Sequence, residues 1–229
     1  MNRWANKIAI VIGAGSHLGQ AITFALLKDG IHVTATDLEE GKMGELKTTY
    51  ENMDKKDTLT GKLELKCDIM DIEETIMKDV NILINNIDAV SVRSSTYLTI
   101  LSEVIRSMRR RQVEGHIFNI NSVHGHFLPT LPDSCSNERD IFLFNECVVS
   151  KHACVALTHM VRRQVVDVKP PIRITSISPS CLKTDIPLNE SNKLSLMPED
   201  VADAIIYALR LKPTVQITEL IIQSTGIHP

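Results

Sequence analysis

The chain has 229 residues, 43% of them hydrophobic and 23% charged, which suits a soluble globular protein with a sizeable core. Its formal net charge of −3 excludes a general electrostatic attraction to nucleic acid or to anionic membranes. Because no linker or low-complexity tract interrupts the sequence, we expect a single domain covering residues 1–229.

Short apolar runs alternate with helical patterns along most of the chain. In order they predict strand 7–12, helix 20–29, strand 31–36, helix 40–53, strand 63–67, short helix 72–78, strand 80–85, helix 96–112, strand 116–120, helix 147–166, strand 172–177, helix 198–211 and strand 215–222. Such alternation is typical of βαβ units. The sequence therefore predicts an α/β fold, a Rossmann-type doubly wound parallel sheet with helices on both faces.

One stretch, residues 127–145, shows neither pattern and contains Pro129 and Pro132. It predicts a long loop, and loops of this length are often lids or binding loops. The apolar residues 142–144 within it are compatible with a small apolar ligand.

A glycine-rich turn follows the first predicted strand and opens the first predicted helix. Backbone N–H groups at such a helix start bind a dinucleotide pyrophosphate, and the residues placed to do so are Gly13, Gly15, Ser16, His17, Leu18 and Gly19. Asp37 ends the second strand, where a carboxylate accepts hydrogen bonds from ribose hydroxyls and repels a 2′-phosphate. This favours NAD over NADP, although a helix N-cap is an equally open role for Asp37.

These motifs, in this order, resemble the short-chain dehydrogenase/reductase (SDR) family, in its farnesol-dehydrogenase-like and dehydrogenase/reductase member 11-like branch. The segments 3–7 and 198–204 carry the resemblance to both ends of the chain. The resemblance implies an NAD(P)-dependent oxidoreductase fold acting on a small alcohol or carbonyl compound. It also implies further dinucleotide contacts at Asp68, Asn85, Pro179 and Thr184.

The resemblance places the catalytic residues as well. Ser122 matches the serine that holds the substrate oxygen, and Lys151 matches the lysine that binds the ribose and lowers the pKa of a tyrosine four residues earlier. Here that earlier residue is Cys147. A thiol is shorter than a phenol, so we expect Cys147 to fall short of the distance that direct proton transfer needs.

Other departures from the family pattern affect the cofactor side. His17, Asp88 and Ser180 add side chains where the family has glycine, and Arg93 falls near the position of the catalytic asparagine. We expect the bulk of His17 to displace the backbone N–H groups of the turn. The sequence therefore predicts weak dinucleotide binding, impaired catalysis, and a role as a binding or dimerisation partner.

Two other functions stay open. One is a working NAD-dependent carbonyl or alcohol oxidoreductase in which Cys147 or Tyr97, with a water, replaces the tyrosine beside Ser122 and Lys151. The other is a redox or ligand sensor based on a reactive thiol at Cys147.

Zinc is a further alternative, because imidazoles and thiols are expected at the same mouth of the sheet. The spacing of these residues matches no known zinc motif; they are His124, His126, Cys135, Cys147 and Cys181. We therefore predict no metal.

Residues 68–96 are shorter than the family pattern, and we expect this region to be locally mobile and to leave sheet edge uncovered. The helices at 96–112 and 147–166 keep their full length. Because the family pairs these two helices across a two-fold axis, the resemblance implies a homodimer, or a heterodimer with a related SDR protein.

The N-terminus offers no signal peptide, because residues 1–7 are polar and the apolar run 8–12 is too short for a leader or a membrane span. The five cysteines are an odd number and include no C-x-x-C pair. Free thiols in a reducing compartment are the expected state, which favours a cytoplasmic protein without a membrane span.

Overall fold

Seven strands form one sheet in the computed structural model, which describes residues 3–37, 39–54, 58–66, 79–87, 94–131, 137–185 and 195–225. The strands are β1 (Ile8–Ile12), β2 (His32–Thr36), β3 (Leu63–Lys66), β4 (Val80–Asn85), β5 (Gly115–Ile120), β6 (Ile172–Pro179) and β7 (Glu219–Ile222). All neighbours pair in parallel, in the order β3-β2-β1-β4-β5-β6-β7. The predicted doubly wound parallel sheet is confirmed.

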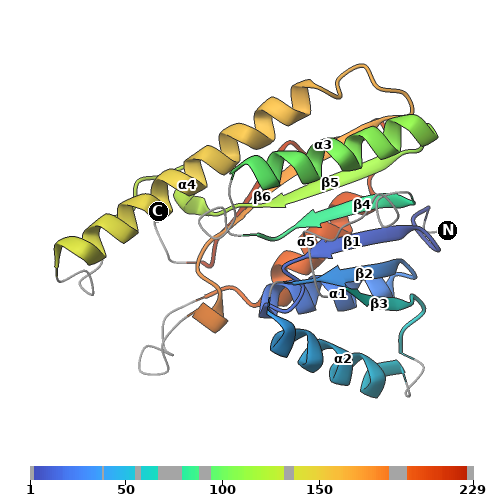
Figure 1. Ribbon diagram of the computed structural model, residues 1–229, viewed down its shortest axis with the longest axis horizontal. Coiled ribbons are helices and arrows are strands. Elements are labelled where there is room, and N and C mark those ends of the chain that lie inside the picture. The colour runs from blue at the N-terminus through green and yellow to red at the C-terminus, as the bar shows by residue number, and fades with distance from the viewer. Residues whose placement is uncertain are drawn as a thin grey trace.

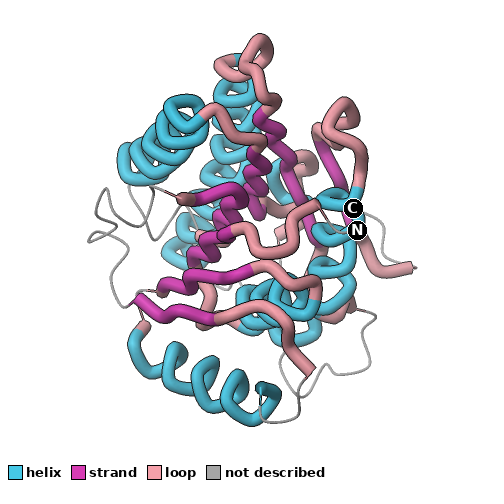
Figure 2. Tube along the Cα trace, turned by 90° about the vertical axis from the view of Figure 1, so that its right-hand side faces the viewer, coloured by secondary structure: helices cyan, strands magenta, loops and turns pink. Residues whose placement is uncertain are grey.

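Helices cover both faces of this sheet (Figures 1 and 2). They are α1 (His17–Lys28), α2 (Glu40–Asp54), α3 (Ser94–Arg111), α4 (Glu138–Arg163) and α5 (Pro198–Arg210), with short 3-10 turns η2 (Val123–Gly125) and η3 (Lys183–Asp185). One apolar core lies between the sheet and the pair α1 and α5, and a second lies between the sheet and α3 and α4. Two layers of helix around a parallel sheet explain why β4, β5 and β6 are buried along their whole length.

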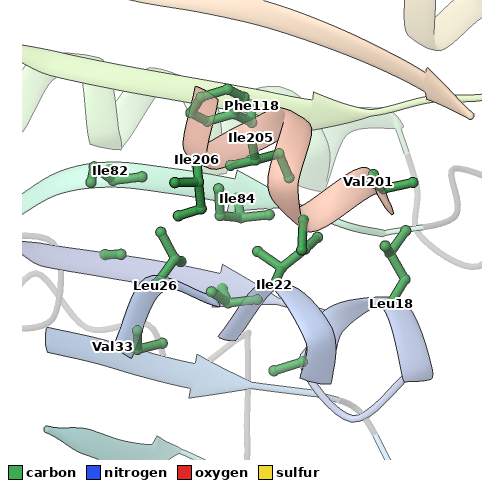
Figure 3. Close-up of a cluster of buried hydrophobic side chains, with 14 of the residues drawn as sticks. Leu18, Ile22, Leu26, Val33, Ile82, Ile84, Phe118, Val201, Ile205 and Ile206 are labelled. Atoms are coloured by element: carbon green, nitrogen blue, oxygen red, sulfur yellow. The ribbon is translucent and has the colours of Figure 1, made fainter. Parts of the chain in front are cut away.

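Figure 3 shows how the first core is assembled. Leu18, Ile22 and Leu26 come from one stripe of α1, because a helix presents every third or fourth residue to the same side. Val201, Ile205 and Ile206 do the same from α5, and both stripes face Ile82, Ile84 and Phe118 of the sheet. This packing fixes the start of α1, where the glycine-rich turn lies.

The order of the strands reverses at β1 and β4, since β2 and β3 lie on one side and β5 to β7 on the other. In open α/β sheets, ligands bind beside such a reversal, at the carboxyl ends of the strands. The loops that follow β1, β4, β5 and β6 meet there, and they carry the residues predicted to bind cofactor and substrate.

The prediction of a loop over 127–145 is wrong in its second half, because α4 begins at Glu138. Asn137 caps this helix, its side chain accepting from the Asp140 N–H at 3.0 Å, and Glu138 and Asp140 complement the positive end of the helix dipole. The apolar residues 142–144 therefore lie on a helix rather than on a binding loop. Residues 132–136 lie outside the described part of the chain.

Smaller differences concern the ends of elements. α1 begins at His17, before the predicted residue 20, because Ser16 caps it, and β7 begins at Glu219 rather than at 215. β6 continues past 177 to Pro179. The predicted short helix 72–78 and most of the shortened region 68–96 lie outside the described residues, so the expected mobility stays a prediction.

Candidate functional site

A cleft of about 700 Å³ opens at the carboxyl ends of the strands. Ligand pockets of small-molecule sites span roughly 300–1,000 Å³. One wall is the glycine-rich turn and the start of α1, and the opposite wall holds Ser122 and Lys151. Pro179, Ser180 and Thr184, which follow β6, complete it. The cleft thus brings together most of the residues predicted for cofactor and substrate.

Hydrogen bonds among its own residues shape the glycine-rich turn. The Ser16 hydroxyl accepts from the Gly19 N–H at 3.0 Å and donates to the Gly13 carbonyl at 2.9 Å. Gly13 has a φ of +72°, and an added Cβ would lie 2.1 Å from the Asn86 carbonyl oxygen. Only glycine fits both requirements. Gly13 and Gly19 shape this turn, while Gly15, Ser16, His17 and Leu18 line the cleft.

Asn86 holds the turn from the opposite side. Its side-chain amide donates to the Gly13 carbonyl and to the Ser16 hydroxyl, both at 3.0 Å, and the residue lines the cleft. The prediction assigned this position to the preceding residue, Asn85, which is instead buried and donates to Asn119 at 3.4 Å. The residue of this pair that lines the cleft is therefore Asn86, and a contact of Asn85 with the dinucleotide stays a prediction.

His17 does not displace the backbone of the turn, contrary to the expectation from its size. It is the first residue of α1, its side chain is exposed, and the Ser16 cap is formed. The N–H groups of His17 and Leu18 have no acceptor within the described part of the protein, and they belong to the unpaired first turn of a helix. The residues present therefore fit the pyrophosphate of a dinucleotide.

Asp37 contacts the turn rather than the cleft. Its two carboxylate oxygens accept from the Gly15 N–H at 2.8 Å and from the Glu39 N–H at 3.0 Å. This arrangement is closer to the capping role than to direct ribose binding, although each oxygen keeps a free lone pair. Two side chains of α2 line the cleft instead, the carboxylate of Glu45 and the ammonium group of Lys42.

Lys42 and Glu45 escaped prediction because α2 reads as a plain polar helix. Lys42 pairs with Glu39 at 2.8 Å, and the hydrogen bond from this pairing raises the pKa of Lys42 above its ordinary value. Asp37 and Glu45 add further negative charge nearby. This end of the cleft therefore carries more negative than positive charge.

At the reaction end, Ser122 and Lys151 both line the cleft, as predicted. Ser122 follows β5 and caps η2, its hydroxyl accepting from the His124 N–H at 3.2 Å. Beneath it the buried Asn121 amide donates to the Ser176 hydroxyl at 2.6 Å, which fixes the end of β5 against β6. Cys147 is half-buried on α4, one turn before Lys151, and is not among the described residues that line the cleft.

Tyr97 does not replace the missing tyrosine. Its side chain is only 3% exposed, lies in the core between α3 and the sheet, and is no part of the cleft lining. Burial raises the pKa of Tyr97 far above its ordinary value, and the nearby Cys154 raises it further. A buried phenol of higher pKa makes a poorer proton donor, so the rescue by Tyr97 is contradicted.

Several predicted residues cannot be placed. Asp68, Asp88, Arg93 and Cys135 lie outside the described residues. Within the described ranges, no group of three or more His, Cys, Asp and Glu side chains is arranged to hold a metal ion.

Comparison with known proteins agrees with the fold and the motifs. The family model described as short chain dehydrogenase matches residues 7–131. The chain is 32% identical over 258 residues to farnesol dehydrogenase of Aedes aegypti, with 99% of each protein covered. It is 28% identical over 264 residues to dehydrogenase/reductase SDR family member 11 of Mus musculus, covering 98% of this chain and 96% of the relative. Both alignments are longer than the 229 residues of this chain, so the relatives have residues at positions that this chain lacks.

Solved structures share the fold at lower sequence identity. An alcohol dehydrogenase from Thermococcus sibiricus, complexed with 5-hydroxy-NADP, superposes with a TM-score of 0.68 at 18% identity, covering 97% of this chain and 98% of that one. Acetoin dehydrogenase from Enterobacter cloacae gives 0.67 at 17%, covering 98% and 99%. With the matched family model and the end-to-end similarity to the Aedes relative, these findings show that the chain belongs to the short-chain dehydrogenase/reductase family.

Proposed function

We propose that this protein binds a nicotinamide dinucleotide in the cleft and oxidises or reduces a small alcohol or carbonyl compound slowly, because its tyrosine position is Cys147. The observation that carries the proposal is the composition of the cleft. The dinucleotide-binding turn, Ser122 and Lys151 line it, whereas Cys147 does not. Binding and substrate orientation are therefore retained, and the group that would exchange the proton directly is lost.

The bound dinucleotide supplies the hydride acceptor or donor of this chemistry. The first turn of α1 would hold its pyrophosphate, and Lys151 and Thr184 line the opposite part of the cleft. Ser122 would orient the substrate oxygen by a hydrogen bond. Relatives named as dehydrogenases support the reaction class.

We favour NAD over NADP as the dinucleotide. Asp37, Glu39 and Glu45 surround Lys42, which already pairs with Glu39. A 2′-phosphate at this end of the cleft would therefore meet a net negative environment, whereas ribose hydroxyls would find carboxylate acceptors. Isothermal titration with NADH and NADPH measures this preference, and tighter binding of NADPH would contradict it.

The test of the impaired reaction is the substitution Cys147→Tyr. It returns a phenol beside Lys151, and we expect turnover of hexanol or cyclohexanol with NAD to rise by about 100-fold or more. Cys147→Phe is the matched control, since it adds the same ring without the hydroxyl and should give no gain. Equal gains in both variants, or a wild-type rate as high as that of the tyrosine variant, would contradict the proposal.

We also infer that α3 and α4 pair with a second copy of the chain. By length and composition alone, α4 is apolar enough to be a candidate membrane span. Only 22% of its most apolar window is buried within the protein, so most of this apolar surface has no cover from the described residues of the same chain. Its buried side packs on β6 and η2, while Val149 and Met160 are 68% and 61% exposed. A helix that is apolar on both sides needs a second covering surface, and a symmetric copy supplies one.

A further inference from the structure

A smaller pocket, of about 330 Å³, lies at the end of the sheet opposite the cleft. α3 ends at Arg111 before β5, and α4 ends at Arg163 before β6. In Figure 1 both helices end toward the upper right, away from the carboxyl ends of the strands. The pocket lies between these two helix ends and is lined by Arg109, Arg163, Gln164, Val166, Asp167, Val168 and Lys169.

The loop after α4 forms one wall of this pocket and is held by contacts of its own. The Val165 N–H donates to the Arg162 carbonyl at 3.2 Å, and the Val168 N–H donates to the Val165 carbonyl at 3.3 Å. Val165 is 4% exposed, and both valines pack into the core between the sheet and α3 and α4. The backbone that carries Asp167 and Lys169 is therefore anchored beside the end of α3.

Three cationic side chains and one carboxylate line the pocket. Arg109 comes from α3, Arg163 from α4 and Lys169 from the loop, and the carboxylate is that of Asp167. The C-terminal ends of the two helices add about half a negative charge each. A surplus of about one positive charge therefore remains at the pocket after the helix dipoles are counted. The chain as a whole has a formal net charge of −3, so this surplus is local.

These three cations differ from neighbouring arginines of the same helices in having no partner. Arg111 donates to the Val80 carbonyl, and Arg162 donates to the Ile174 carbonyl at 3.0 Å. The side chains of the three pocket cations form no hydrogen bond or ion pair with any residue that the structure describes. Pairing within the described chain therefore does not explain why cations from three elements line one pocket.

We propose that this pocket binds the phosphate monoester group of a small ligand. A guanidinium group presents a planar fork of N–H donors that matches two phosphate oxygens, and a lysine ammonium group adds a point charge. The Gln164 amide lines the same pocket and supplies a further donor. The described lining has no aromatic side chain on which a nucleic-acid base could stack, and the volume suits a small molecule.

The first test is isothermal titration of the whole protein with glycerol 3-phosphate. We expect the combination of Arg109→Gln and Arg163→Gln to weaken binding by about 10-fold or more, because two charge-assisted donor forks are lost. The combination of Arg106→Gln and Arg139→Gln is the matched control. It removes the same charge from α3 and α4 at exposed positions outside the pocket, and it should bind as wild type does.

A second test locates the phosphate in the wild-type protein. Proton–nitrogen correlation spectra follow the Nε–H signals of the arginine side chains during the titration. We expect the signals of Arg109 and Arg163 to shift, while that of Arg106, which pairs with Glu103, stays in place. Lys169→Gln removes a single cation from the exposed loop and should weaken binding by about 3-fold or more.

A phosphate monoester is carried by soluble metabolites and by the headgroup of phosphatidate, and sedimentation with vesicles separates the two sources. Phosphatidylcholine vesicles with and without phosphatidate are the probes. Binding of glycerol 3-phosphate without binding of phosphatidate vesicles would assign a soluble ligand. Vesicle binding that requires phosphatidate and is lost with Arg109→Gln and Arg163→Gln would assign the headgroup.

Two results would overturn the phosphate site. One is a wild-type protein that binds neither glycerol 3-phosphate nor phosphatidate vesicles. The other is equal binding by wild type and by the protein with Arg109→Gln and Arg163→Gln, which would place the phosphate elsewhere, such as in the dinucleotide cleft. Neither result depends on turnover, so the pocket is tested independently of the proposed function.

Discussion

At the scale of single residues, Tyr97 offers a direct test of whether another phenol takes part in the reaction. Its hydroxyl lies beside Thr158 and Asn85 but forms no well-formed hydrogen bond among the described residues. We therefore expect Tyr97→Phe to change the free energy of unfolding by less than about 1 kcal/mol, because little hydrogen bonding is lost. Turnover should stay at the wild-type rate. Chemical denaturation measures the free energy of unfolding, and steady-state kinetics measure turnover. A large loss of turnover at unchanged stability would show that Tyr97 takes part in the reaction.

The residue scale also shows what a sequence can say about a site. Ser122, Lys151 and the glycine-rich turn were predictable, because strand ends in a parallel sheet meet at one edge. The sequence could not predict which of two adjacent asparagines faces the cleft. Asn86 lines it, and Asn85 is buried. Successive side chains point to opposite sides of a strand, so an error of one residue exchanges the two roles.

At the scale of elements, the C-terminal end of α5 is held by a buried cation. Arg173 of β6 is 2% exposed and donates to the Ala208 and Val215 carbonyls, both at 3.1 Å. The Trp4 indole donates to the Leu209 carbonyl at 2.8 Å. The bonds to Ala208 and Leu209 satisfy carbonyls in the last turn of α5, which have no partner within the helix, and a cation there complements the helix dipole. The bond to Val215 ties the segment after α5 to the same side chain.

We expect Arg173→Met to lower the free energy of unfolding by about 2–4 kcal/mol, since buried carbonyls lose a charged donor. Arg210→Met is the matched control. Arg210 lies at the same end of α5 but is exposed, and its pairing with Asp29 at 2.6 Å is a surface ion pair worth up to about 1 kcal/mol. Urea denaturation of both variants measures the difference. Equal losses would mean that burial of Arg173 adds nothing to the stability of this helix end.

Elements were more predictable than their ends. All seven strands and all five long helices match predicted segments, because apolar periodicity reflects which side of each element is covered. The start of α4 was missed because its first turns are exposed and lack an apolar stripe that packs on the sheet. The sequence marks the start of α4 by a local pattern instead, which is Asn137 as the N-cap followed by acidic residues in the first turn.

At the scale of the whole molecule, the exposed side of α4 predicts the oligomeric state. If a second copy covers this side, a charge placed there should separate the copies, because it would be buried without a partner. We expect wild type to be a dimer by light scattering, and Val149→Glu to shift it to a monomer with unchanged far-ultraviolet circular dichroism. Tyr207→Glu is the matched control, since Tyr207 is also well exposed, at 61%, and lies on α5 on the opposite face of the sheet. A monomeric wild type would remove the second copy from the proposal. A wild-type dimer that Val149→Glu leaves intact would show that the copies meet elsewhere, and the apolar side of α4 would then need another explanation.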